Sequence, residues 1–167
     1  MRVCVVYASK YEATAGIARV IGEVLEQRGC SVQVAEAAQA PAAEPFDAVI
    51  VGSAVYVGQW RREAVAYLRT HAEVLRQRPV WLFSSGPIGR DDPQPRDPSP
   101  QAGELLQLVG AREHRVFTGA LDRSKLGWVD RTIAGALKVP EGDFRDWDAV
   151  RDWAADVADA LDDLASG

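Results

Sequence analysis

Residues that build metal centres, disulfides and catalytic triads are scarce in this sequence. Its 167 residues include two cysteines and two histidines, without a Cys-x-x-Cys pair or a histidine cluster. We therefore expect no metal site, and we expect Cys4 and Cys30 to be free, structural thiols. No convincing triad is present, so we predict no catalytic residue. We interpret His71 and His114 as surface histidines that lie away from any ligand.

Long apolar segments and an excess of positive charge are also absent. The least polar stretch, residues 48–58, falls well short of the roughly 20 residues that a membrane-spanning helix needs. The start of the chain does not resemble a signal peptide, because its short apolar run ends at Ser9 and Lys10. The formal net charge of −5 argues against nucleic-acid binding through a basic face. We expect a cytoplasmic protein with at most peripheral membrane contact.

The common glycine-rich nucleotide loops are missing after the first predicted strand, residues 3–8. That strand leads instead into a turn and a helix through Ser9, Lys10, Tyr11, Glu12, Ala13 and Thr14. Backbone N–H groups and hydroxyls at such a turn, together with the dipole of the following helix, favour a bound phosphate. The spacing between the hydroxyls suits a terminal phosphomonoester such as that of FMN. Alternatively, Ser9 and Thr14 only cap the helix.

Strands alternate with helices along the chain. We predict strands at residues 3–8, 31–34, 48–52, 79–84 and 116–118, and helices at residues 14–27, 61–76, 101–109 and 147–164. This alternation predicts a single α/β domain over residues 1–167, with a doubly wound five-stranded parallel sheet in the order 2-1-3-4-5 and helices on both faces.

Two segments stand out as additions to this pattern. A polar insertion containing four prolines occupies about residues 88–100, and an extra helical segment occupies about residues 122–142. The extra segment has an apolar face on which Leu126, Val129, Ile133 and Leu137 recur. That face either packs against the sheet edge or the insertion, or docks a membrane, a partner chain or a hydrophobic substrate.

The ligand crevice of such a sheet lies at the carboxyl ends of strands 1, 3 and 4. The third strand is followed by Ser53, Ala54, Val55, Tyr56, Val57, Gly58 and Trp60, and the fourth strand ends in Ser84, Ser85, Gly86, Pro87, Ile88 and Gly89. Glycines permit close backbone approach to a ligand, and Tyr56 or Trp60 could stack on a planar ring. Alternatively, these are ordinary turn residues, and the aromatic side chains fill gaps in the core.

Three motifs together resemble the flavodoxin-domain proteins, a family that includes menaquinone-dependent protoporphyrinogen oxidase. They are Tyr-Ala-Ser-Lys-Tyr-x-x-Thr at residues 7–14, Val-Gly-Ser-Ala-Val-Tyr-Val-Gly at residues 51–58 and Phe-Ser-Ser-Gly-Pro-Ile-Gly at residues 83–89. The resemblance implies an FMN-dependent oxidoreductase with a quinone or a redox protein as its partner. It also implies that residues 9–14 bind the FMN phosphate, and that residues 53–58 and 84–89 contact the two sides of the isoalloxazine ring. The alternatives are an electron carrier without its own substrate and a flavin-free interaction module.

Glu12 departs from the family pattern, in which glycine is common at this position of the phosphate loop. A carboxylate about 5 Å from a phosphate dianion costs several kcal/mol at an effective dielectric constant of about 20. A positive φ at this position would add backbone strain. We therefore expect that Glu12 points into solvent, pairs with Lys10 or weakens FMN binding.

Overall fold

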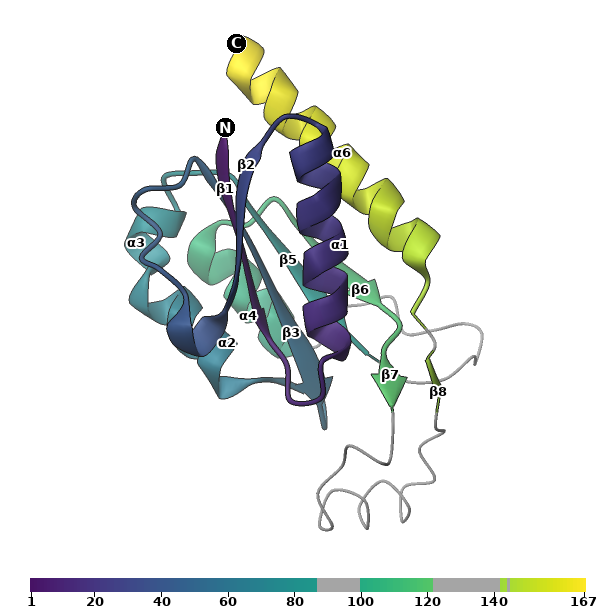
Figure 1. Ribbon diagram of the computed structural model, residues 1–167. Coiled ribbons are helices and arrows are strands. Elements are labelled where there is room, and N and C mark those ends of the chain that lie inside the picture. Colours follow the sequence, from purple (N-terminus) through teal and green to yellow (C-terminus); the bar gives the residue numbers. More distant parts are fainter. Residues whose placement is uncertain (87–99, 122–141, 144) are drawn as a thin grey trace.

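A computed structural model describes residues 1–86, 100–121, 142–143 and 145–167 (Figure 1). At its centre is a parallel sheet with the strand order β2-β1-β3-β5-β6. These strands are β1 (Arg2–Ala8), β2 (Ser31–Glu36), β3 (Ala48–Tyr56), β5 (Val80–Ser85) and β6 (Glu113–Phe117). The predicted order 2-1-3-4-5 and the flavodoxin-like α/β architecture are confirmed.

Helices cover both faces of the sheet. On one face lie α1 (Ala13–Gln27) and α6 (Trp147–Ser166), which contact each other (Figure 1). On the other face lie α2 (Arg62–Thr70), α3 (Ala72–Leu75), α4 (Pro100–Val109) and the 3-10 helix η1 (Ala37–Gln39). The single helix predicted over residues 61–76 is therefore divided at His71, where Thr and His, both modest helix formers, are adjacent.

Strands alternate their side chains between two cores. In β1, Val3 and Val5 pack toward α1 and α6, whereas Cys4 and Val6 pack toward α2 and α4. Cys4 and Cys30 are both free, and burial raises the pKa of the Cys4 thiol to about 12. Cys4 is therefore an unreactive core residue at neutral pH.

Aromatic packing closes the core on the α1 and α6 side. The rings of Phe83, Phe117 and Trp153 lie with centroids 5.5–6.2 Å apart. Gly52 makes room for this cluster, because a Cβ atom there would lie only 2.0 Å from the Phe83 ring. Burying each large side chain contributes about 1.5–3 kcal/mol to folding.

Short strands that were not predicted lie at the carboxyl edge of the sheet, which is the side where the parallel strands end. β4 (Gln59–Trp60) returns antiparallel to β3, and β7 (Ala120–Leu121) pairs with β8 (Gly142–Asp143). The polar insertion at 88–100 and the helical segment at 122–142 lie outside the described residues, apart from Pro100 in α4 and Gly142 in β8. Within the described residues, no helix is long and apolar enough to cross a membrane, and no cluster of side chains could hold a metal ion.

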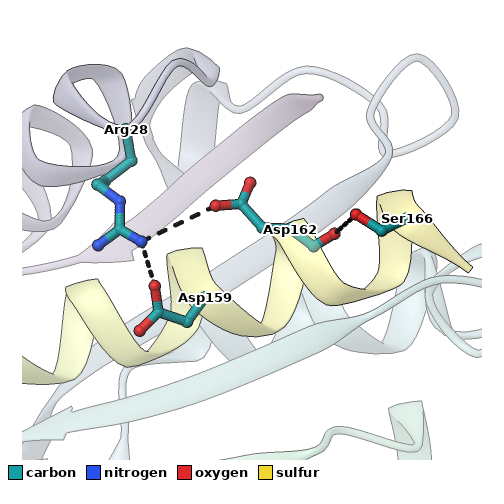
Figure 2. Close-up of polar contacts among 4 residues, drawn as sticks. All are labelled: Arg28, Asp159, Asp162 and Ser166. Atoms are coloured by element: carbon teal, nitrogen blue, oxygen red, sulfur yellow. Dashed lines mark hydrogen bonds and ion pairs between the residues drawn. The ribbon is translucent and has the colours of Figure 1, made fainter.

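At the opposite, amino edge of the sheet, where the parallel strands begin, polar contacts connect two helices. Arg28, directly after α1, pairs with Asp159 and lies 3.8 Å from the carboxylate of Asp162 (Figure 2). One turn further along α6, the Ser166 hydroxyl donates to the Asp162 carbonyl at 2.9 Å. These side chains are exposed, so they position α1 against α6 more than they stabilise the fold.

Candidate functional site

The turn between β1 and α1 forms the first wall of the candidate site. No side chain caps α1, and its first backbone hydrogen bond runs from the Gly16 N–H to the Glu12 carbonyl at 3.0 Å. The N–H groups of the first helical turn therefore lack intrahelical acceptors. Thr14 is fully buried in this turn, and its hydroxyl has no hydrogen-bond partner. An unpaired buried hydroxyl costs about 1–3 kcal/mol, so the turn fits an anionic ligand such as a phosphate.

The other residues of the predicted phosphate turn differ in exposure. Ser9, Tyr11 and Ala13 are half-buried, whereas Lys10 and Glu12 are exposed. The Lys10 ammonium lies 5.2 Å from the centre of the Tyr11 ring. Glu12 has the left-handed conformation, with φ 65° and ψ −8°. For a residue other than glycine this conformation costs about 1–2 kcal/mol, so the backbone strain expected from a positive φ at this position is present.

The β3–β4 hairpin forms the second wall. Tyr56 pairs with Gln59 across a two-residue turn made by Val57 and Gly58, which have φ values of 50° and 71°. Two successive positive φ angles are typical of a type I′ turn, for which Asn-Gly is the preferred sequence. A β-branched residue is a clear outlier in this conformation. Val57 is 82% exposed and Tyr56 is 47% exposed, so the hairpin presents an apolar tip to solvent.

The side chain of Trp60 is buried beneath the hairpin rather than exposed on it. It is 4% exposed, and its indole N–H donates to the Ser84 hydroxyl at 2.9 Å. Its backbone N–H donates to the side-chain oxygen of Gln101 at 2.7 Å. The structure thus favours the core-filling alternative for Trp60. Tyr56 is the exposed aromatic residue of this hairpin.

His114 corrects one of our interpretations of the sequence. The structure places it within β6, half-buried, with Nε2 2.7 Å from the Ser84 hydroxyl and Nδ1 buried without a partner. Burial lowers the pKa of its imidazole. The interpretation as a surface residue away from the crevice was wrong, because β6 begins at Glu113 rather than at residue 116. His71 is half-buried beside the Tyr67 ring, with the ring centres 4.6 Å apart.

Strand parity was the signal that could have placed His114. Phe117 packs toward α1 and α6, so residues an odd number of positions away, including His114, belong to the opposite face. On that face His114 reaches the Ser84 hydroxyl, which also binds Trp60. The partners of this three-residue network are far apart in the sequence, and Gln101 beside it carried no motif at all.

The serines of the two predicted ring-binding loops mainly hold those loops in place. The Ser53 hydroxyl accepts from the Arg61 N–H and donates to the Ala54 carbonyl, both at 2.8 Å. Ser85 is buried, Val55 is half-buried, and the Gly86 N–H donates to the Phe117 carbonyl at 2.8 Å.

Gly86 has a φ of 132°, which strongly favours glycine at this bend. Pro87, Ile88 and Gly89 lie outside the described residues. The carboxyl ends of β1, β3 and β5 lie side by side in the sheet, at the edge where doubly wound folds bind ligands.

Comparison with known families agrees with this geometry. A model of the flavodoxin domain matches residues 4–148. The chain belongs to the flavodoxin domain family. A search among curated proteins finds no significant match. The family matches give no support to the specific resemblance to menaquinone-dependent protoporphyrinogen oxidase.

Solved structures with the same fold include flavodoxins of similar length. Oxidised flavodoxin 1 from Bacillus cereus is 15% identical, with a TM-score of 0.60 and coverage of 93% of this chain and 95% of that one. Oxidised flavodoxin 2 from Bacillus cereus is 25% identical, with a TM-score of 0.56 and coverage of 83% and 99%.

A longer enzyme also contains this fold. Rubredoxin oxygen:oxidoreductase from Desulfovibrio gigas is 16% identical to this chain, with a TM-score of 0.69. The alignment covers 99% of this chain but only 37% of that protein. The same architecture therefore occurs both as a stand-alone flavodoxin and as part of an oxidoreductase.

Proposed function

We propose that this protein binds FMN at the carboxyl edge of its sheet and acts as an oxidoreductase that passes electrons to a quinone or a protein partner. The observation that carries the proposal is Thr14, a fully buried hydroxyl without a partner at the uncapped start of α1. When bound, FMN supplies one- and two-electron redox chemistry. The protein needs only to bind it, orient it and control its surroundings.

Most of the predicted residues have a role in this proposal, Trp60 and Glu12 being exceptions. The Thr14 hydroxyl and the N–H groups of the first turn of α1 donate to the phosphate, and the Lys10 ammonium adds positive charge. The hydroxyls of Ser9 and Tyr11 are further donors. Residues 53–58 contact one side of the ring and residues 84–89 the other, with Tyr56 as the exposed aromatic surface.

The second candidate is an electron carrier without a substrate of its own. It is supported by the similar length of the matched flavodoxins, of which this chain covers 95% and 99%. A third candidate, a flavin-free interaction module, is favoured only by Glu12 with its carboxylate in the phosphate turn.

Titration of FMN, followed by quenching of its fluorescence, tests the proposal. We expect wild-type protein to bind FMN more tightly than riboflavin, which lacks the phosphate. Thr14→Val should weaken FMN binding about 10- to 100-fold, because one hydrogen bond to a charged group is lost. The same variant should leave riboflavin binding unchanged. Thr70→Val, at the exposed end of α2, is the matched control and should change neither affinity.

Two results would contradict the proposal. If neither the wild type nor Glu12→Gly binds FMN, the flavin-free module becomes the better account. If Thr14→Val binds FMN as tightly as the wild type, the phosphate lies elsewhere.

A spectroelectrochemical titration of the FMN-loaded protein separates the first two candidates, the oxidoreductase and the electron carrier. A carrier should take up its two electrons at well-separated potentials, whereas a hydride-handling enzyme need not.

A further inference from the structure

A cavity lies beside the predicted phosphate turn and the β3–β4 hairpin. Its volume is about 370 Å³, within the range of small-molecule pockets. It lies where the β1–α1 turn, the β3–β4 hairpin and the start of α2 meet. The lining residues are Lys10, Tyr56, Gln59, Trp60, Arg61, Arg62 and Glu63.

The lining of this cavity is positively charged. Lys10, Arg61 and Arg62 outnumber the single carboxylate, Glu63. The pKa of Glu63 is lowered chiefly by a hydrogen bond from its own backbone N–H, with further lowering by the two arginines, so it is ionised at neutral pH. The N-terminus of α2, which no side chain caps, adds the positive end of a helix dipole.

Two atoms of the lining are buried without hydrogen-bond partners. The Arg61 guanidinium contacts Glu63 through Nη2 at 3.2 Å, but its Nε–H has no acceptor. The second carboxylate oxygen of Glu63, Oε2, is also unpaired. A guanidinium binds carboxylates and phosphates through two parallel N–H donors, of which Nε–H is commonly one. Glu63 already contacts Nη2 on this edge of the guanidinium, so an incoming oxyanion would bind the unpaired Nε–H beside Glu63 or replace the Glu63 carboxylate there.

The local charge contrasts with that of the whole chain. The formal net charge is −5, and α6 alone carries Asp148, Asp152, Asp156, Asp159, Asp162 and Asp163. A cationic cavity on an acidic protein concentrates small anions at that position. The half-exposed ring of Tyr56 provides an apolar wall beside the charges.

We propose that this cavity binds the carboxylate or phosphate of a small organic anion, with Arg61 as the principal contact and the organic part against Tyr56. Lys10 and Tyr56 belong to the proposed flavin site as well, whereas Arg61, Arg62 and Glu63 are not among the residues proposed to bind FMN. We also assign this anion as the electron donor or acceptor of the bound flavin, and that assignment rests on the proposed function. The binding itself does not.

Titration calorimetry with 2-naphthoate tests the proposal on both FMN-loaded and flavin-free protein. The uncharged 2-naphthamide has nearly the same shape and serves as the ligand control. We expect saturable 2-naphthoate binding that is at least tenfold tighter than that of the amide. Arg61→Gln should weaken it by tenfold or more, since the N–H donors of the guanidinium are lost. Arg69→Gln, on the same helix but outside the cavity, is the matched variant and should bind normally.

Three outcomes would overturn this assignment. They are absence of saturable binding, an equal loss in Arg69→Gln, and binding only to flavin-free protein with displacement by FMN, which would make the cavity part of the flavin site. A chain that fails to bind FMN yet binds 2-naphthoate through Arg61 would refute the proposed function and leave the anion site standing.

Discussion

The two edges of the sheet differ in how the chain turns. At the amino edge, positive φ angles fall on glycines, Gly29 after α1 and Gly110 after α4, with values of 88° and 63°. At the carboxyl edge they also fall on Glu12 and Val57, the two non-glycine residues with positive φ within the described ranges. Backbone strain of this kind collects at functional sites, where the surrounding structure holds it in place. This difference supports the proposal that the carboxyl edge is the functional one.

Polar groups show the same contrast. At the amino edge, Arg28 is paired with two aspartates of α6 (Figure 2). At the carboxyl edge, Thr14, Arg61 and Glu63 each bury a side-chain atom that has no hydrogen-bond partner. Among the described residues, three of the four buried side-chain atoms without a partner therefore belong to the carboxyl edge, the fourth being Nδ1 of His114.

The largest effect is expected at Glu12, in the affinity for FMN. Glu12→Gly removes both a carboxylate close to the phosphate and a strained φ, and should tighten FMN binding about 10- to 100-fold. Glu12→Gln separates the causes, because it removes the charge and keeps the strain. Fluorescence titration in low salt measures both variants. Unchanged affinity in each would mean that the carboxylate lies too far from the phosphate to matter.

A smaller effect, in stability, is expected at the hairpin. Val57→Asn should raise the free energy of unfolding by about 1 kcal/mol, because Asn tolerates the left-handed conformation and Val does not. Gly29→Ala at the amino edge should lower it by about 1 kcal/mol for the same reason. Urea denaturation measures both. If the two substitutions change stability in the same direction, the proposed contrast in strain between the edges fails.

At His114 we expect a change in the pH dependence of stability. Burial lowers the pKa of this imidazole in the folded state, so the unfolded chain binds its proton more readily. The stabilisation due to the neutral form is complete above the ordinary pKa of about 6.5 and is lost as the pH falls through the folded-state value. His114→Asn should flatten this decline, measured by urea denaturation at several pH values. His71→Asn serves as the control, and an equal flattening there would refute the assignment to His114.

The smallest effect is expected at the amino edge. Arg28→Ala removes an exposed ion pair with Asp159 and should leave the denaturation midpoint nearly unchanged (Figure 2). Asp152→Ala, an exposed α6 substitution outside this pair, is the control. A clear loss of stability in Arg28→Ala alone would show that the contact between α1 and α6 depends on charge as well as on apolar packing.

The strand order, and with it the edge at which the predicted binding loops begin, followed from local patterns. Buried β-branched runs such as residues 48–51 predict parallel strands, and the alternation with amphipathic helices predicts the doubly wound order that the structure has. The residues that follow the strands at the carboxyl edge could also be named from the sequence, since each such segment comes directly after a predicted strand. Local composition is sufficient for these features because each depends on neighbouring residues.

Only the tertiary structure decided which side chains meet at that edge. Ser84 binds Trp60 across 24 positions and His114 across 30, and strand parity gives the face on which His114 lies but not its partner. The left-handed φ of Glu12 and Val57 is set by the turns that join their elements, since neither residue prefers it. The amino-acid order determines which strands and helices form. Their close packing determines which polar atoms are satisfied and which remain available to a ligand.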